Sequence, residues 1–219
     1  MEDRLTPGLY LELGDLDSDT YATARAKELA GLPGVERVTW WANNVPGRTE
    51  LPRTIPDGTL LGVAEVDDTF VAPDPLPDTT ARLFRRHPRP NQGILTGRPT
   101  TGLLVVWISP RTEADAPRLR DWADFVHIRH IAAAGLPGFA TITPYDNAEG
   151  GDPRYMHFYE LDTDDPEGAY QEMARRMARY FGGSRTEDFR VWADFEPPGG
   201  RLVYCNTFRL LGDTRRSQD

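Results

Sequence analysis

Hydrophobic and polar residues alternate in short stretches along this chain, and residues that favour turns separate the stretches. A period of two is typical of half-buried β-strands, whereas apolar residues at every third or fourth position indicate helices. The pattern predicts strands over residues 8–14, 35–42, 60–66, 103–108, 139–145, 155–161, 189–195 and 201–210, with a short one near residue 94. It predicts helices over residues 18–30, 78–86, 114–134 and 166–181.

Two parts of the chain resemble each other. The tetrapeptide Gly-Leu-Pro-Gly occurs at residues 31–34 and again at residues 135–138, each time after an Ala-rich helix and before a strand. Pro and Gly end many helices, so the tetrapeptide alone is weak evidence. The shared order of strand, helix, tetrapeptide, strand and strand is stronger, and it indicates an internal duplication.

The order βαββαβ in each part is typical of the ferredoxin-like fold. We therefore expect an α+β protein of two tandem ferredoxin-like halves. Residues 1–90 would form a degenerate first half, 91–101 a linker, 102–211 the second half and 212–219 a frayed tail. Packing the two uncovered sheet faces together would bury both and give a pseudo-dimeric α/β barrel within one chain. Exposed strand edges would also allow a homodimer.

Composition narrows the class of protein. With 39% hydrophobic residues among 219, the chain can build a sizeable core. A net charge of −9 disfavours nucleic acids and anionic membranes as partners. No apolar run approaches the roughly 20 residues needed to span a bilayer, and no signal peptide is recognisable, so we expect a cytoplasmic protein. Cys205 is the single cysteine, which excludes an internal disulfide and a cysteine-based zinc cluster.

The densest candidate chemistry lies in the helix over residues 114–134. Trp122, Val126 and His130 form an i, i+4 row that faces inward, and Arg129 borders the row. An imidazole exchanges protons near neutral pH, so His130 is the leading candidate for a general acid or base. The alternative is a partly buried histidine with a structural hydrogen bond.

A metal site in the same helix is not expected. Asp124, His127 and His130 are spaced i, i+3, i+6, and their directions fan over roughly 120° of the helix circumference. Asp124 and His127 would point to the outer side of the helix.

A second group of candidates lies on the predicted strands. Alternation puts His157 and Tyr155 on one face of their strand, and Thr143 and Tyr145 alternate on the neighbouring strand. A polar sheet face of this kind would line a cavity between sheet and helix, or would be wet. Packing is the alternative for His157. At the end of another strand, one ring of the pair Trp40 and Trp41 is free to stack on a planar ligand.

Three short motifs follow one another in residues 124–161: the helical stretch 125–130 (Phe-Val-His-Ile-Arg-His), Pro-Gly-Phe at 137–139 and Pro-Arg-Tyr at 153–155. With these motifs, the region resembles the EthD-type dimeric α/β barrel family. Phe125 stands where that family usually has Trp, and Arg129 stands where it has an acid. The resemblance implies His130 as the family histidine, and it implies an α/β barrel whose members include cyclases and aromatic monooxygenases.

We expect an enzyme that acts on a hydrophobic aromatic or polyketide-like small molecule without a cofactor. His130, His157 and Tyr145 would carry the acid–base chemistry, in a closed cavity beside the long helix. The substrate would contact Arg129, Tyr155, Trp122, Val126, Thr143 and Trp40. Two alternatives remain, a non-catalytic protein that binds a small molecule, and a haem protein ligated by one of the helix histidines.

Overall fold

The structure, a computed structural model, describes residues 6–193 and 199–215. Its strands are β1 (Gly8–Gly14), β2 (Val35–Asn43), β3 (Leu60–Val66), β4 (Thr80–Arg86), β5 (Gln92–Gly93), β6 (Gly102–Pro110), β7 (Phe139–Asn147), β8 (Tyr155–Leu161) and β9 (Gly200–Arg215). Its helices are α1 (Ser18–Thr20), α2 (Ala26–Ala30), α3 (Ala116–Trp122), α4 (Ile128–Ala133), α5 (Pro166–Tyr180) and α6 (Glu187–Trp192). A π-helical segment, Tyr21–Arg25, joins α1 to α2, and another, Ala123–His127, joins α3 to α4.

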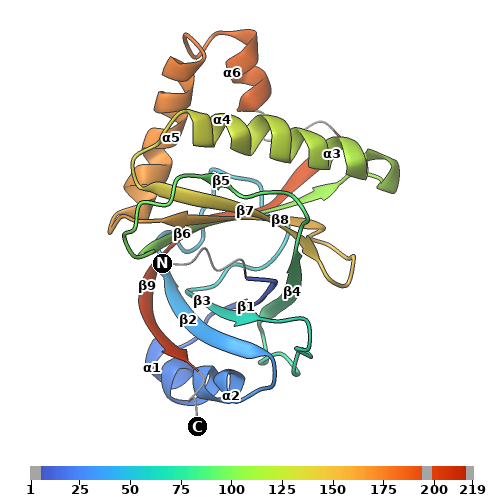
Figure 1. Cartoon of the computed structure of the whole chain (residues 1–219), viewed down its shortest axis with the longest axis vertical. Helices are drawn as coiled ribbons and strands as arrows, with labels where there is room; N and C mark the ends of the chain where they lie inside the picture. Colours follow the sequence, from blue (N-terminus) through green and yellow to red (C-terminus); the bar gives the residue numbers. More distant parts are fainter. Residues whose placement is uncertain (1–5, 194–198, 216–219) are drawn as a thin grey trace.

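Eight strands form a closed antiparallel barrel (Figure 1). Their order is β4-β1-β3-β2-β9-β6-β8-β7, and pairing of β4 with β7 from Phe84↔Asn147 to Arg86↔Tyr145 closes the ring. Strands β4-β1-β3-β2 come from the first part of the chain, and β9-β6-β8-β7 repeat the same order in the second part. The two parts therefore meet at two seams, β2 with β9 and β4 with β7.

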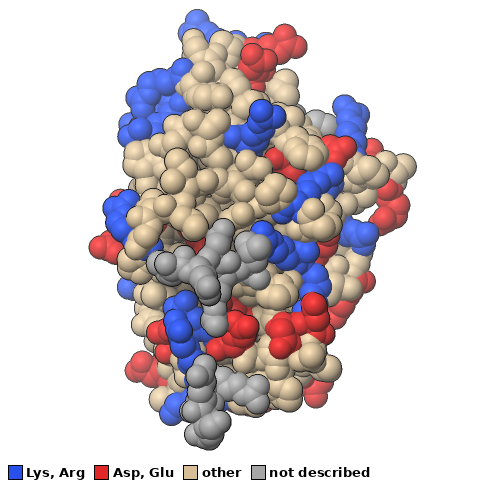
Figure 2. All heavy atoms as spheres, viewed as in Figure 1, with Lys and Arg blue, Asp and Glu red and all other residues tan. Residues whose placement is uncertain are grey.

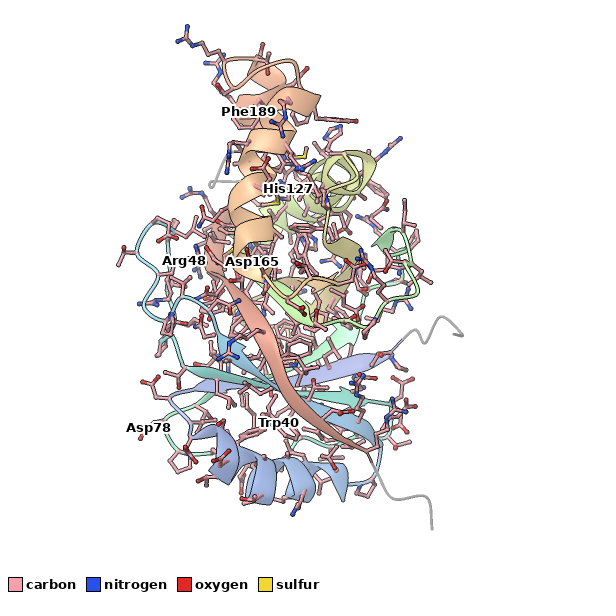
Figure 3. The ribbon with its side chains drawn as sticks, turned by 90° about the vertical axis from the view of Figure 1, so that its left-hand side faces the viewer. Trp40, Arg48, Asp78, His127, Asp165 and Phe189 are labelled. Carbon is pink, nitrogen blue, oxygen red and sulfur yellow. The ribbon has the colours of Figure 1, made fainter. Side chains whose placement is uncertain are left out.

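The inside of the barrel is filled by large side chains. Trp107 lies at its centre, with ring centroids 5.7 Å from Phe84 and 5.4 Å from Tyr204. Trp41 points into this core, whereas Trp40 points to the outer face and packs toward α2 (Figure 3). The expected split of the two adjacent Trp rings is confirmed. Packed side chains therefore occupy the inside of the barrel.

Helices cover opposite outer faces of the barrel (Figure 1). The helix formed by α1 and α2 lies at one end, and α3 to α6 lie at the other. None of the described helices is long and apolar enough to cross a membrane. Acidic and basic side chains are interspersed over the face shown in Figure 2, with no broad area of a single sign.

Two predicted elements were wrong. Residues 78–86 were expected as a helix, yet Thr80–Arg86 is β4. Phe84 points into the barrel while Ala81 and Leu83 pack outward, so both faces are apolar and the alternation is hidden. Residues 189–195 were expected as a strand, but α6 occupies them as far as Trp192. The helix begins there because the Thr186 hydroxyl accepts the Phe189 N–H at 3.2 Å.

The end of the chain also differs from expectation. A frayed tail was predicted from residue 212, but β9 continues to Arg215 and pairs with β2. Residues 194–195 and 216–219 of these predictions lie outside the described residues.

Candidate active site

The long helix turns a different side to the sheet than was expected. Asp124 was expected to point outward, but it is 3% exposed and faces β8. Leu119, Arg120 and Ala123 precede it at helical spacing and are also buried, so the inward stripe lies on their side of the helix and not on the side of Trp122 and Val126. Arg129, expected to border the inner stripe, is exposed.

Asp124 joins three side chains from different elements. Its Oδ1 lies 3.1 Å from Nε2 of His157, and its Oδ2 lies 3.0 Å from both Arg120 Nε and Arg89 Nη1. Burial lowers the pKa of His157, which is 2% exposed, and outweighs the attraction of Asp124. Burial raises the pKa of Asp124, but the His157 hydrogen bond and the arginine charges leave it lowered. The pair is therefore a carboxylate that accepts a hydrogen bond from a neutral imidazole.

Arg120 is a buried cation with only part of its hydrogen-bonding capacity used, because within the described part of the chain only its Nη1 donates, to Tyr145 O at 3.4 Å. It is 3% exposed, and among the described residues neither Nε nor Nη2 has a partner of good geometry, although Asp124 forms an ion pair with it. Its Nη2 lies 3.6 Å from Asp146 Oδ1, too far for a hydrogen bond, and that oxygen is also unpartnered. Burial lowers the pKa of Arg120 against the charges of both aspartates. An additional anion or hydrogen-bond acceptor would stabilise this guanidinium.

His87 lies on the other side of Asp146. It follows β4, and its backbone N–H donates to Pro144 O at 3.0 Å, which fixes it against β7. Its Nδ1 lies 2.6 Å from Asp146 Oδ2. A carboxylate accepts from Nδ1–H, so Nε2 is the basic nitrogen of the ring.

These groups share one cavity of about 400 Å³ at the edge of the helix layer. Its wall comprises His87, Arg120, Asp146, Arg154, Tyr155 and the turn 147–150. Tyr155 supports the wall because its hydroxyl donates to Ala116 O at 3.3 Å and its ring lies 4.7 Å from the Arg120 guanidinium. A base, a cation and a carboxylate therefore converge on one space that a small molecule can enter.

The cavity expected beside His130 is filled. The His130 ring lies 5.0 Å from Phe181 and 5.9 Å from Tyr180, and it lines neither this cavity nor a second one of about 360 Å³ near Asp162. Ile128, Ile131 and other apolar residues pack the space between helix and sheet. Trp122 and Val126 are half-buried next to this packing and line neither cavity.

The expected polar sheet face is divided between two surfaces. Tyr145 pairs with Met156, and Thr143 pairs with Phe158, so Tyr145 and Thr143 share the inside of the barrel with those residues. His157, Tyr155 and Tyr159 face the helices. A shift of one residue in register exchanges the faces of a strand, and register is not visible in the sequence. Of the site residues predicted from sequence, Tyr155 lines the cavity. His157 does not line it, but contacts Asp124, which in turn contacts Arg120 of the cavity wall.

A haem does not fit at the helix histidines. His127 lies in the angle between α5 and the long helix (Figure 3), stacked on Trp192 at 5.1 Å, with Nδ1 3.1 Å from Trp192 O. Desolvation there lowers its pKa to about 3, and no described cavity opens beside it. Within residues 6–193 and 199–215, no three His, Cys, Asp or Glu side chains are grouped to hold a metal ion.

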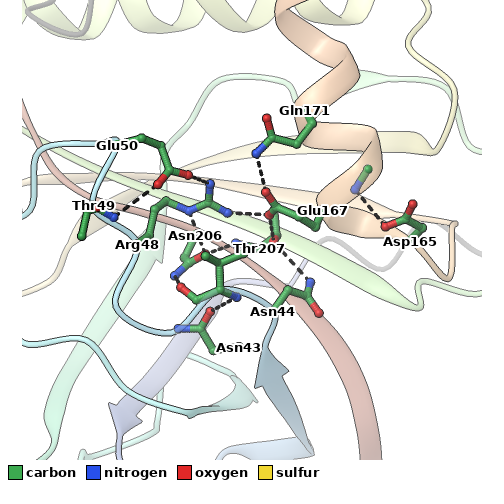
Figure 4. Close-up of polar contacts among 12 residues, drawn as sticks. Asn43, Asn44, Arg48, Thr49, Glu50, Asp165, Glu167, Gln171, Asn206 and Thr207 are labelled. Carbon is green, nitrogen blue, oxygen red and sulfur yellow. Dashed lines mark hydrogen bonds and ion pairs between the residues drawn. The ribbon is translucent and has the colours of Figure 1, made fainter.

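In a second polar cluster, around Arg48, the side chains bind one another (Figure 4). Arg48 ion-pairs with Glu50 and with Glu167 of α5, and its Nε donates to Asn206 of β9 at 3.1 Å. Glu167 also accepts from Thr207 at 2.6 Å. These contacts tie the loop after β2 to the second part of the chain, so their role is structural.

Comparison with known proteins supports the fold. No protein-family model and no curated protein sequence matches the chain. A proposed monooxygenase of Lactobacillus acidophilus aligns over 97% of both chains with a TM-score of 0.51 and 11% identity. An anthrone oxidase-like protein aligns over 96% of this chain and 93% of its own, with a TM-score of 0.50 and 13% identity. A regulator of staphylococcal pathogenesis aligns over 94% and 99%, with a TM-score of 0.54 and 10% identity.

The chain has the dimeric α+β barrel fold. At these identities the likeness concerns architecture alone, and this α+β barrel is closed within one chain. His87 and Arg120 were both missed by sequence reasoning, because they are 33 positions apart and belong to no local motif.

Proposed function

We propose that the chain is an acid–base enzyme whose own side chains transfer a proton within the cavity at Arg120. The observation that carries this proposal is the buried Arg120 guanidinium, whose Nε and Nη2 have no hydrogen-bond partner among the described residues and which lies beside a His–Asp pair. Buried polar groups without partners are rare in native proteins, and each calls for a ligand, water or strain. An oxyanion would supply the acceptors that the Arg120 guanidinium lacks, which supports a ligand as the explanation.

The chemistry follows from the positions of the groups. Arg120 would bind a carbonyl or phenolic oxygen of the substrate, and His87 Nε2 would accept a proton from the adjacent carbon or hydroxyl. The electrons of the broken bond move onto the oxygen, and the resulting enolate or phenolate is neutralised by Arg120. Asp146 stabilises the imidazolium, which returns the proton to product. Isomerisation, cyclisation and dehydration all begin with such a step.

The polar wall limits the substrate. A cavity of about 400 Å³ is within the usual range for small ligands. With Arg120, Arg154 and His87 in its wall beside Asp146 and Glu149, it favours a molecule that carries an ionisable oxygen over a purely apolar one.

The proposal includes an origin by duplication of an EthD-type, ferredoxin-like unit. The two parts of the chain share the strand order 4-1-3-2 and a π-helical segment in the first helix. In each segment a charged side chain reaches the outer sheet face, Arg25 to Glu12 at 2.6 Å and Asp124 to His157 at 3.1 Å. These correspondences support the duplication, and the 125–130 stretch supports the family.

Exchange of deuterium from solvent into an enolisable aromatic ketone such as anthrone tests the proton transfer without knowledge of the natural substrate. We expect the protein to accelerate exchange above buffer. The variant His87→Asn should lose roughly 100-fold or more of this acceleration, the usual contribution of a general base. The variant His130→Asn should keep it, because that ring lies outside the cavity.

The two histidine variants also separate the alternatives. Loss in His130→Asn with retention in His87→Asn would place the chemistry at the histidine expected from sequence and contradict the proposal. Saturable binding of the ketone with no exchange in any variant would favour the non-catalytic binding protein.

A further inference from the structure

The segment 87–91 leads from β4 to β5, and the Arg89 side chain joins it to the helix that carries Arg120. Its backbone is restrained, because Pro88 and Pro90 flank Arg89 and the Arg89 N–H donates to His87 O at 2.7 Å. The Pro144 hydrogen bond holds His87 from the β7 side, and the Arg89 side chain holds the same short segment from the helix side.

Arg89 is held by four residues of the long helix, one of which is Arg120 itself, whose backbone oxygen accepts from Arg89 Nη1 at 3.4 Å. Arg89 Nη2 lies 2.7 Å from Asp121 Oδ1, and its Nη1 lies 3.0 Å from Asp124 Oδ2. Its guanidinium stacks on Phe125 at 4.4 Å. This contact gives a reason for Phe125, a large apolar side chain that is 52% exposed on the helix surface.

We propose that Arg89 is a positioning residue that sets the spacing between His87 and Arg120, a role that rests on the proposed function. Asp124 Oδ2 is shared by Arg89 and Arg120, each at 3.0 Å, so one carboxylate oxygen fixes both arginines. The first places the base, and the second binds the oxyanion. A small displacement of a base from its substrate costs a large factor in rate, about 100-fold for 1 Å.

The chain offers a matched control in Arg98. It belongs to the same connecting region, and its Nη2 lies 2.9 Å from Asp162 Oδ2, but it is 64% exposed and its partner is not on the helix that carries Arg120. Substitution of Arg98 removes an arginine ion pair without touching Asp121, Asp124 or Phe125.

The experiment measures Arg89→Ala, Arg89→Lys, Phe125→Ala and Arg98→Ala in two ways. The first is the NMR chemical shift and line width of the His87 Cε1–H, which can be assigned with His87→Asn because the chain has four histidines. The second is kcat and KM for deuterium exchange into anthrone. We expect Arg89→Ala to move and broaden the His87 signal and to lower kcat roughly 10- to 100-fold with little change in KM. Arg89→Lys and Phe125→Ala should have intermediate effects, and Arg98→Ala none.

An unchanged His87 signal and an unchanged kcat in Arg89→Ala would overturn the positioning role. Equal effects of Arg89→Ala and Arg98→Ala would do the same, because they would indicate general destabilisation. If the protein without substitutions gives no exchange at all, the proposed function fails, while the His87 signal still decides whether Arg89 positions that ring.

Discussion

At the scale of single residues, the site depends on charges that the barrel keeps out of water. Asp124 links these groups, because His157, Arg120 and Arg89 all contact its carboxylate. Breaking a buried ion pair leaves an uncompensated charge and costs about 3–5 kcal/mol in typical proteins. The group is therefore expected to be rigid, which suits residues that must hold a base and a cation in fixed positions.

The buried His157 predicts how stability depends on pH. Its pKa is lowered in the folded state, whereas an unfolded histidine titrates near pH 6.5. Below about pH 6.5 His157 binds a proton in the unfolded chain but not in the folded chain. The free energy of unfolding therefore decreases as the pH is lowered, by up to about 1.4 kcal/mol per pH unit for this residue. His127, with a pKa of about 3, acts in the same direction.

Replacement of His157 by Gln should flatten this dependence. Gln can donate to Asp124 but does not titrate. The free energy of unfolding, measured by urea denaturation between about pH 6.5 and 4.5, should therefore change less steeply with pH, by the equivalent of close to one bound proton. Lowering pH further would protonate Asp124, whose stabilising contribution is lost in both proteins below its depressed pKa. An identical slope in the two proteins over that window would show that His157 is not held neutral.

At the scale of elements, β4 is the strand that sequence reasoning missed and the one on which the site depends. Strands β3 and β8 have the bounds predicted, residues 60–66 and 155–161, because a run of apolar residues ends at clear turn signals. In β4 the adjacent apolar residues Leu83 and Phe84 pack on opposite faces of the strand. Apolar and polar residues therefore do not alternate there, and the strand could not be recognised from the sequence. Without β4 the barrel stays open and His87 has no fixed position.

We expect Phe84→Ala to destabilise the protein by about 3–5 kcal/mol, the usual cost of removing a buried aromatic ring from a packed core. Phe84 is fully buried against Trp107 and lies within the seam where β4 pairs with β7. Chemical denaturation measures the change, with Leu83→Ala on the outer face as a milder control. A loss below about 1 kcal/mol for Phe84→Ala would show that the seam is not packed as described.

At the scale of the whole molecule, the site is shared by the two parts of the chain. The first part was expected to be a degenerate scaffold, but it contributes His87, and the second part contributes Arg120, Asp146 and the supporting Asp124. The general architecture could be predicted, because hydrophobic period and repeated order act locally. The site could not, because strand register, the side of the long helix that faces the sheet and the closing pair β4–β7 are properties of the folded chain.

The central claim is that Arg120 binds an oxyanion in this cavity, and the dissociation constant of a planar aromatic carboxylate such as 1-naphthoate, a stable substitute for the enolate, tests it most directly. An NMR titration of the wild-type protein, of Arg120→Met and of Arg176→Met, which alters the second cavity, compares the two arginines. We predict that Arg120→Met binds about 10- to 100-fold more weakly, as expected for loss of a charge-assisted hydrogen bond, and that Arg176→Met binds as the wild type does. Wild-type affinity in Arg120→Met, or an equal loss in Arg176→Met, would contradict the account.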